Sequence, residues 1–196
     1  MSRLTLVLGG VRAGKSAFAL RLALRQAQRE RIGQAQGDRE GSRVLFVATA
    51  EAGDAEMAAR IVAHRASRPA EWTTLEAPVD VVGALGPVVD GYDMVVLDCL
   101  TLWVSNLLLR TPDASAGEVI AARAEELLAL QERSAASWVV VSNEVGLGVI
   151  PPTELGRAFE DALGRVNQLF AAQADAVYFM AAGLLLQMKG EAGAGL

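Results

Sequence analysis

The amino-acid sequence predicts an α/β fold, with a mostly parallel sheet and helices on both of its faces. Short apolar runs alternate along the chain with segments of helical spacing, and the runs are apolar at consecutive positions, as in "RVLFVA" and "WVVV". Strands that are apolar on both sides are typical of parallel sheets buried between two layers of helices. The chain is long enough for one domain with a full core, and we expect a single domain over residues 1–196.

The first half of the chain alternates strands with helices. Apolar runs bounded by polar or glycine residues predict strands at residues 4–8, 43–48, 71–75 and 94–97. Apolar residues at helical spacing predict helices at residues 15–29, 54–66 and 79–89. Asp54 is a suitable N-cap for the second of these helices. The polar, glycine-spaced stretch Ala27–Ser42 is interpreted as a surface insertion that begins at the end of the first helix.

The second half continues the alternation with longer helices. The same criteria predict helices at residues 101–109, 117–135 and 153–173, and strands at residues 138–141, 176–180 and 184–188. Ligands of such sheets bind beyond the carboxyl ends of the strands. The residues that follow each strand are therefore the first candidates for a functional site.

Composition and charge exclude several classes of function. The formal net charge of −5 is unfavourable for binding a nucleic-acid backbone. The single cysteine, Cys99, can form neither an internal disulfide nor a zinc cluster. No signal peptide is recognisable, and no apolar run reaches the roughly 18 residues of a membrane span. We therefore expect a cytoplasmic protein that binds no nucleic acid and does not cross a membrane.

The stretch "GGVRAGKS" matches the pattern G-x-x-x-x-G-K-[ST] in full and lies between an expected strand and an expected helix. In that context successive backbone N–H groups face one concavity, which attracts phosphate oxygens. Lys15 would reach the β and γ phosphates, and Ser16 would hold Mg²⁺. A chance match on a glycine-rich turn is the alternative. The phosphate loop makes the predicted fold a P-loop NTPase-type three-layer sandwich, and the loop comprises Gly9, Gly10, Val11, Arg12, Ala13, Gly14, Lys15 and Ser16.

Two further strand ends carry polar residues. Asp98 follows "MVVL" and is the best candidate for the acidic residue that organises Mg²⁺ in such enzymes. An ordinary aspartate that caps the next helix is the alternative. Asn143 and Glu144 follow "WVVV" and are expected near the phosphates, with a plain structural loop as the alternative. The sequence has no Asn-Lys-x-Asp stretch of the kind with which a signalling GTPase reads guanine.

His64 is the only histidine of the chain. On the expected helix it shares a face with Met57 and Ile61, and this spacing favours a packed, hydrogen-bonded histidine at the edge of the core. The alternative is a nucleophile, because a neutral imidazole can attack phosphorus and form a phosphoramidate. The arginines around it could then pair with phosphate oxygens.

Several stretches, taken in order, resemble the bifunctional adenosylcobinamide kinase / adenosylcobinamide-phosphate guanylyltransferase family of cobalamin biosynthesis. They are "LGGVRAGKS", "FVATAEAGDAEMAARIVAHRASRPAEWTTLEAP", "LDCLTLWVSNLL", "SNEVGLGVIP" and "GRVNQ". The resemblance implies two activities on one fold: phosphorylation of the aminopropanol hydroxyl of adenosylcobinamide with ATP or GTP, and transfer of GMP from GTP to that phosphate with release of pyrophosphate. It also implies a homo-oligomer.

The resemblance further implies roles for individual residues. The family histidine stands in the context R-I-x-x-H-[RK], here Arg60–Arg65, so that His64 would carry GMP covalently and act as a catalytic residue with Lys15. Mg²⁺ would be held by Ser16 and Asp98. Besides the phosphate loop, the nucleotide site would include Val47, Ala48, Thr49, Arg65, Ala66, Ser67, Arg68, Glu76 and Asp98.

Two positions depart from the family pattern. Ala13 stands where serine is usual, which removes a hydroxyl but leaves the backbone cradle. Ala63 stands at the first position of a histidine pair found in some members, which leaves His64 as the only possible intermediate. Two other functions have to be distinguished from this one: a single-step P-loop small-molecule kinase in which His64 is structural, and a nucleotide-dependent switch protein.

Overall fold

The computed structural model describes residues 3–33, 42–66, 68–111 and 115–190. Within these residues one seven-stranded sheet has the strand order β3-β2-β4-β5-β1-β6-β7. Its strands are β1 (Leu4–Gly9), β2 (Val44–Ala48), β3 (Thr73–Glu76), β4 (Met94–Asp98), β5 (Ser137–Val141), β6 (Ala176–Ala181) and β7 (Leu184–Lys189). All neighbouring pairs are parallel except β6 and β7. That pair can be antiparallel because Ala182 and Gly183, both with positive φ, form its two-residue turn.

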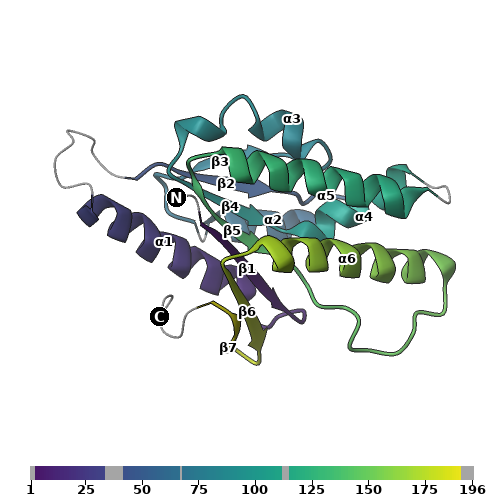
Figure 1. Cartoon of the computed structure of the whole chain (residues 1–196). Coiled ribbons are helices and arrows are strands. Elements are labelled where there is room, and N and C mark those ends of the chain that lie inside the picture. Colours follow the sequence, from purple (N-terminus) through teal and green to yellow (C-terminus); the bar gives the residue numbers. More distant parts are fainter. Residues whose placement is uncertain (1–2, 34–41, 67, 112–114, 191–196) are drawn as a thin grey trace.

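Helices cover both faces of the sheet, which confirms the predicted α/β three-layer fold (Figure 1). One face packs against α3 (Val81–Leu85), α4 (Leu100–Arg110), α5 (Ala116–Arg133) and α6 (Glu154–Gln173). The other face packs against α1 (Lys15–Gly33). Among the helices of the described residues, none is long and apolar enough to span a bilayer.

Two apolar cores, one on each face, stabilise this arrangement. On the α4–α6 face, Trp103, Trp138 and Phe170 are almost fully buried. On the α1 face, the rings of Phe18 and Tyr178 pack edge to face with their centroids 5.5 Å apart. The apolar runs found in the sequence are the strands between these two cores. Their consecutive apolar residues are explained because side chains on both faces are buried.

The sequence placed some elements wrongly. The helix expected at 79–89 is shorter: α3 spans only Val81–Leu85, capped by Asp80, and a 3-10 turn follows at Val89–Gly91. The dipeptide Gly86-Pro87 explains the break, because proline cannot donate the next helical hydrogen bond. Conversely, α1 continues to Gly33, past its expected end. Residues 34–41 of the supposed surface insertion lie outside the described residues.

The register of the sheet brings the carboxyl ends of its strands into one row. Ala48 on β2 pairs with Glu76 on one side and with Asp98 on the other. Asp98 in turn pairs with Val141 on β5, which pairs with Val7 on β1. Because all five strands are parallel, the chain leaves each of them at the same side of the sheet, where their carboxyl ends lie. The phosphate loop and Asp98 meet at these carboxyl ends.

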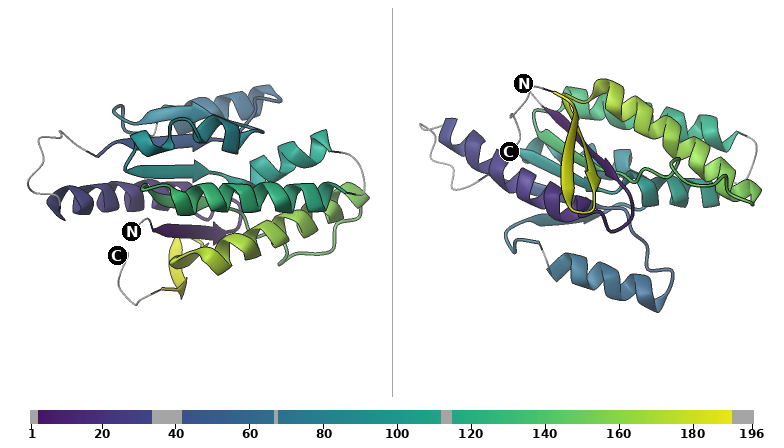
Figure 2. Two further views of the ribbon diagram at one scale, coloured as in Figure 1. Left: turned by 45° about the horizontal axis from the view of Figure 1, so that its top comes forward. Right: turned by 90° about the horizontal axis from the view of Figure 1, so that it is seen from below.

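The helix α2 (Ala55–Ala66) is not part of either packed layer. Asp54 caps it as expected, accepting a hydrogen bond of 2.7 Å from the backbone N–H of Met57. None of its residues is buried, however. Figure 2 shows the helix set apart from the sheet, tied to β2 and β3 by the segments at its two ends.

A truncation in the α6 layer tests this packing scheme. Because Phe170 is fully buried between α6 and the sheet, Phe170→Ala is expected to lower the free energy of unfolding by about 3–5 kcal/mol. Leu155→Ala on the same helix is the control, because Leu155 is 54% exposed; its cost should stay within about 0.5 kcal/mol. Equilibrium urea unfolding measures both. Equal losses for the two variants would contradict the assignment of the core.

Candidate functional site

The phosphate loop between β1 and α1 has a backbone that requires glycine at two positions. Gly9 has φ +147°, and a Cβ atom there would lie 2.2 Å from the carbonyl oxygen of Met180 on β6. Gly14 has φ +93°. The glycines of the motif are therefore explained by the close approach of β6 and by the left-handed backbone. Both features are those that a loop curled around phosphate needs.

The loop is held in place from two sides. On one side, the backbone N–H of Glu144 donates to the carbonyl oxygen of Gly9 (3.1 Å). On the other side, the N–H of Gly183 in the β6–β7 turn donates to the carbonyl oxygen of Ala13 (3.2 Å). The cradle is thus fixed by its neighbours in the sheet.

Lys15 begins α1 and is only 7% exposed. Its Nζ atom donates to the carbonyl oxygen of Gly10, 2.7 Å away, so that the side chain folds back over the loop. Burial lowers the pKa of the ammonium group, and electrostatic interactions with Cys99 and Asp98 partly offset this. A partly desolvated cation at a ring of backbone N–H groups is well placed to bind phosphate oxygens.

Asp98 lies at the end of β4, beside the phosphate loop. The hydroxyl of Ser16 donates to its carboxylate. Burial raises the pKa of Asp98, while the Ser16 hydroxyl and the positive charges of His64, Arg68 and Lys15 act in the opposite direction. The alternative in which Asp98 caps the next helix is wrong, because Cys99 holds the N-cap position of α4.

Ser16 and Asp98 fit the donor set that Mg²⁺ prefers. Both supply oxygen atoms, and their hydrogen bond shows that the two side chains meet. In the described part of the chain no group of three or more histidine, cysteine, aspartate or glutamate residues could hold a metal ion. Mg²⁺ commonly binds one or two protein ligands together with substrate phosphates and water.

Arg68 contributes a second partly buried cation. Its guanidinium carbon lies 3.6 Å from the ring centroid of Phe46, and one of its terminal nitrogens is 3.4 Å from the hydroxyl of Thr74. Its Nε atom is buried without a hydrogen-bond partner. Burial lowers the pKa of Arg68, and the charge of Asp98 partly compensates. An arginine with an unsatisfied donor beside the phosphate loop is suited to an anionic ligand.

His64 is exposed, in the last turn of α2. The expectation of a histidine packed at the edge of the core is therefore wrong: spacing placed it on a face with Met57 and Ile61, but α2 does not pack on the sheet. The charge of His64 nevertheless acts on Asp98. Its neighbour Arg65 lies 3.6 Å from Glu76 in an exposed ion pair, an interaction of small energetic weight.

Thr49, expected at the nucleotide, is fully buried and has a structural role. Its hydroxyl donates to the carbonyl oxygen of Cys99 (2.7 Å) and accepts from the N–H of Cys99 (2.9 Å). Asn106 on α4 donates to the carbonyl oxygens of Thr49 (2.8 Å) and Pro78 (2.9 Å). We call this set the Thr49 clasp. It joins the ends of β2 and β4 and holds Asp98 beside the phosphate loop.

Two more buried polar residues order the segment after β5, and sequence reasoning missed them. The hydroxyl of Thr101 accepts from the N–H of Asn143 (2.8 Å), and the side-chain amide of Asn167 donates to the carbonyl oxygen of Asn143 (3.0 Å). Their signal in the sequence was a polar residue on an otherwise apolar helix face. Such a residue is expected to pair with backbone when it is buried.

The structure thus brings several of the expected site residues together, and the others differ in their burial. Lys15, Ser16, Asp98, Arg68 and His64 interact around one edge of the sheet, and Ala48 and Glu76 end strands in the same row. Val47 has its side chain in the core instead. Others are exposed or outside the described residues: Val11, Arg12 and Ala66 are exposed, and Ser67 is not described.

Comparisons with known proteins agree with the family resemblance found in the sequence. A family model described as cobinamide kinase / cobinamide phosphate guanyltransferase matches residues 5–188. The chain is 41% identical over 187 residues to the bifunctional adenosylcobalamin biosynthesis protein CobP of Pseudomonas aeruginosa, an alignment that covers 95% of this chain and 97% of that protein. It is 36% identical over 193 residues to the protein of that description named CobU from Escherichia coli, covering 94% and 98%. The CobU protein of Salmonella typhimurium matches with the same identity and coverage.

The Thr49 clasp can be tested by removing one hydroxyl. Thr49→Val leaves the N–H of Cys99 without its partner and removes one of the two donors to the carbonyl of Cys99. We therefore expect a loss of about 1–3 kcal/mol in the free energy of unfolding. Thr49→Ser keeps the hydroxyl and should retain most of the stability. Urea unfolding of the two variants measures the difference. Equal stability of Val and Ser variants would show that the hydroxyl has no structural role.

Proposed function

The chain belongs to the cobinamide kinase / cobinamide phosphate guanyltransferase family, and on this premise we propose how one phosphate loop serves both of its reactions. The protein is a bifunctional enzyme of adenosylcobalamin biosynthesis. In the first reaction it phosphorylates the hydroxyl of adenosylcobinamide. In the second it transfers GMP from GTP to the resulting phosphate. The proposal depends on one observation: the phosphate loop, with its buried Lys15, lies next to Asp98. His64 is close enough to Asp98 to interact with it electrostatically.

In the kinase step, the triphosphate lies in the loop with its γ phosphate toward the acceptor hydroxyl. Backbone N–H groups of the loop and Lys15 neutralise charge on the β and γ phosphates and orient them. Arg68 supplies a further positive charge on this side of the site. Mg²⁺, held by Ser16 and Asp98, would screen the charge of the phosphate oxygens when it is bound.

In the guanylyl transfer, His64 acts as the nucleophile. Neutral imidazole nitrogen attacks the α phosphorus of GTP, a P–N bond forms, and the bond from the α phosphorus to its bridging oxygen breaks with release of pyrophosphate. An oxygen of adenosylcobinamide phosphate then attacks the same phosphorus. The P–N bond breaks, and the electron pair returns to the imidazole. The product is adenosylcobinamide-GDP.

The loose packing of α2 supports this assignment. A histidine that must meet the α phosphorus in one reaction and leave room for the γ phosphate in the other needs a support that can shift. Because α2 buries none of its residues, its displacement exposes little apolar surface and costs little free energy. We therefore expect α2 to move between the two reactions.

We further propose that the protein is a cytoplasmic homo-oligomer. Leu184, Leu186 and Met188 alternate along the edge strand β7 and are each more than 60% exposed. An exposed apolar stripe on a sheet edge is a typical subunit contact.

The exposed apolar stripe on β7 predicts the mass of the protein in solution. Light scattering of the wild type should give a multiple of 20.6 kDa. The variant Leu186→Lys should shift the mass toward the monomer, because a buried unpaired charge is costly at an interface. A monomeric wild type would contradict the proposal.

The covalent intermediate gives the sharpest test of the function. His64→Ala, incubated with GTP labelled at the α phosphate, should acquire no acid-labile label, while phosphorylation of adenosylcobinamide is largely retained. Glu56→Ala on the same helix is the control and should label like the wild type. Label on the His64 variant would overturn the nucleophile assignment.

The same measurement separates the alternatives. A single-step kinase would show no acid-labile label in the wild type. A switch protein would hydrolyse nucleotide at a rate that adenosylcobinamide does not change.

A further inference from the structure

The connection from β5 to α6, residues 142–153, is anchored at its start. We call it the β5–α6 loop. Asn143 is held by Thr101 and Asn167, and the N–H of Glu144 donates to Gly9 in the phosphate loop. Val145 is half-buried and packs against the core on the α4–α6 face. The first four residues of the loop are therefore fixed by α4, α6 and β1.

The loop is anchored at its other end as well. A terminal nitrogen of Arg157 donates to the carbonyl oxygen of Pro151 (3.1 Å). Thr153 caps α6 by accepting from the N–H of Gly156 (3.1 Å). The middle of the loop thus lies between two fixed ends. Because folding already restricts these ends, the loop loses less conformational entropy when a ligand binds to it.

The middle of the loop is apolar and almost fully exposed. Leu147 is 79% exposed, Val149 93% and Ile150 76%. Three large apolar side chains within four residues are unusual at a loop tip, where polar residues dominate. Their contiguity indicates a surface that contacts a large, partly apolar ligand or a partner.

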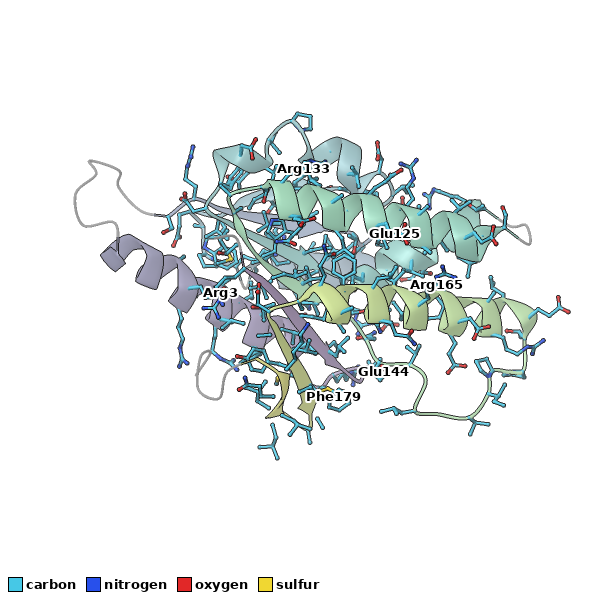
Figure 3. The ribbon with its side chains drawn as sticks, in the orientation of Figure 1. Arg3, Glu125, Arg133, Glu144, Arg165 and Phe179 are labelled. Atoms are coloured by element: carbon cyan, nitrogen blue, oxygen red, sulfur yellow. The ribbon has the colours of Figure 1, made fainter. Side chains whose placement is uncertain are left out.

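The position of the β5–α6 loop in the fold indicates which ligand its apolar residues contact. In the sheet β5 lies between β4, which ends at Asp98, and β1, which leads into the phosphate loop. The β5–α6 loop therefore begins between the two groups that hold the triphosphate. Figure 3 shows Glu144 beside the end of β1, and Figure 1 shows the loop running outward from there before it returns to α6.

We propose that the β5–α6 loop is the binding surface for the corrinoid acceptor, and that Glu144 takes the proton of its hydroxyl in the kinase step. The inference rests on the proposed function. The acceptor hydroxyl must reach the γ phosphorus over the end of β5, and the macrocycle attached to it must then lie outside the phosphate loop. The exposed Leu147, Val149 and Ile150 lie in the continuation of that path and match the methyl-rich edge of a corrin ring.

The carboxylate of Glu144 is oriented for this role. Its Oε1 atom accepts from the N–H of Gly146, 2.9 Å away, which fixes the carboxylate against the loop backbone. In the reaction the hydroxyl proton passes to Glu144, and the hydroxyl oxygen forms a bond to the γ phosphorus. The bond from that phosphorus to the β–γ bridging oxygen breaks, and its electron pair leaves with the nucleoside diphosphate.

The two reactions differ in their need for this base. The acceptor of the second reaction is a phosphate, which already has an ionised oxygen at neutral pH and therefore needs no base to remove a proton before it attacks. Loss of the Glu144 carboxylate should therefore affect the first reaction alone. This asymmetry separates a base from a residue that only supports the fold.

The test of the base is Glu144→Gln, assayed separately with adenosylcobinamide and with preformed adenosylcobinamide phosphate. We expect kcat of the kinase step to fall about 100-fold, while guanylyl transfer is retained. Glu125→Gln, an exposed residue on α5 (Figure 3), is the matched control. An unchanged kinase rate, or an equal fall in both reactions, would overturn the role of Glu144.

The test of the apolar surface is the double variant Val149→Ser/Ile150→Ser. We expect KM for adenosylcobinamide and for its phosphate to rise about tenfold, because two apolar contacts are lost, with KM for GTP unchanged. Leu109→Ser/Val119→Ser, at exposed apolar positions on α4 and α5, is the control. Unchanged corrinoid KM, or a changed oligomeric mass with unchanged KM, would overturn the assignment. Failure of the proposed function itself is distinguishable, because the wild type would then not phosphorylate adenosylcobinamide.

Discussion

A buried lysine and a half-buried aspartate at the carboxyl ends of the strands form the constraint on which the site depends. Burial disfavours the charged form of each: it lowers the pKa of Lys15 and raises that of Asp98. Each charge partly compensates the other. In the proposed function, a triphosphate with a magnesium ion would give Lys15 an anionic partner and Asp98 a cationic one. The electrostatics of the folded chain therefore favour the ligand that the phosphate loop accommodates.

This arrangement needs a rigid sheet edge, and the chain provides one through backbone contacts. The parallel register aligns Ala48, Asp98 and Val141 in one row. The Thr49 clasp ties two of these strand ends together, and Glu144 and Gly183 hold the phosphate loop from its two sides. By contrast, α2 has no buried residue. The molecule thus combines a fixed phosphate loop with a loosely packed helix that carries the proposed nucleophile, His64. Such a helix suits the proposal that two different phosphorus atoms react at one site.

Most of the fold could be predicted, because consecutive apolar residues in a strand and glycines before a lysine have few other physical explanations. The errors occurred where local pattern and tertiary context disagree. Helical spacing continued past Gly86-Pro87, but the helix ended before it. Spacing also placed His64 at the edge of the core, whereas α2 stands away from the sheet. The roles of Thr49, Thr101 and Asn167 depend on backbone groups that only the folded chain brings near them.

The central claim is that one phosphate loop serves both reactions. The most direct measurement compares the rates of phosphorylation of adenosylcobinamide and of GMP transfer to its phosphate in Lys15→Met, with the fold checked by circular dichroism. Lys15 is the buried cation of the loop, so the account predicts that both rates fall together and that neither is restored by excess of the corrinoid acceptor. Retention of either reaction at the wild-type rate would show that it uses a second nucleotide site, and would contradict the account.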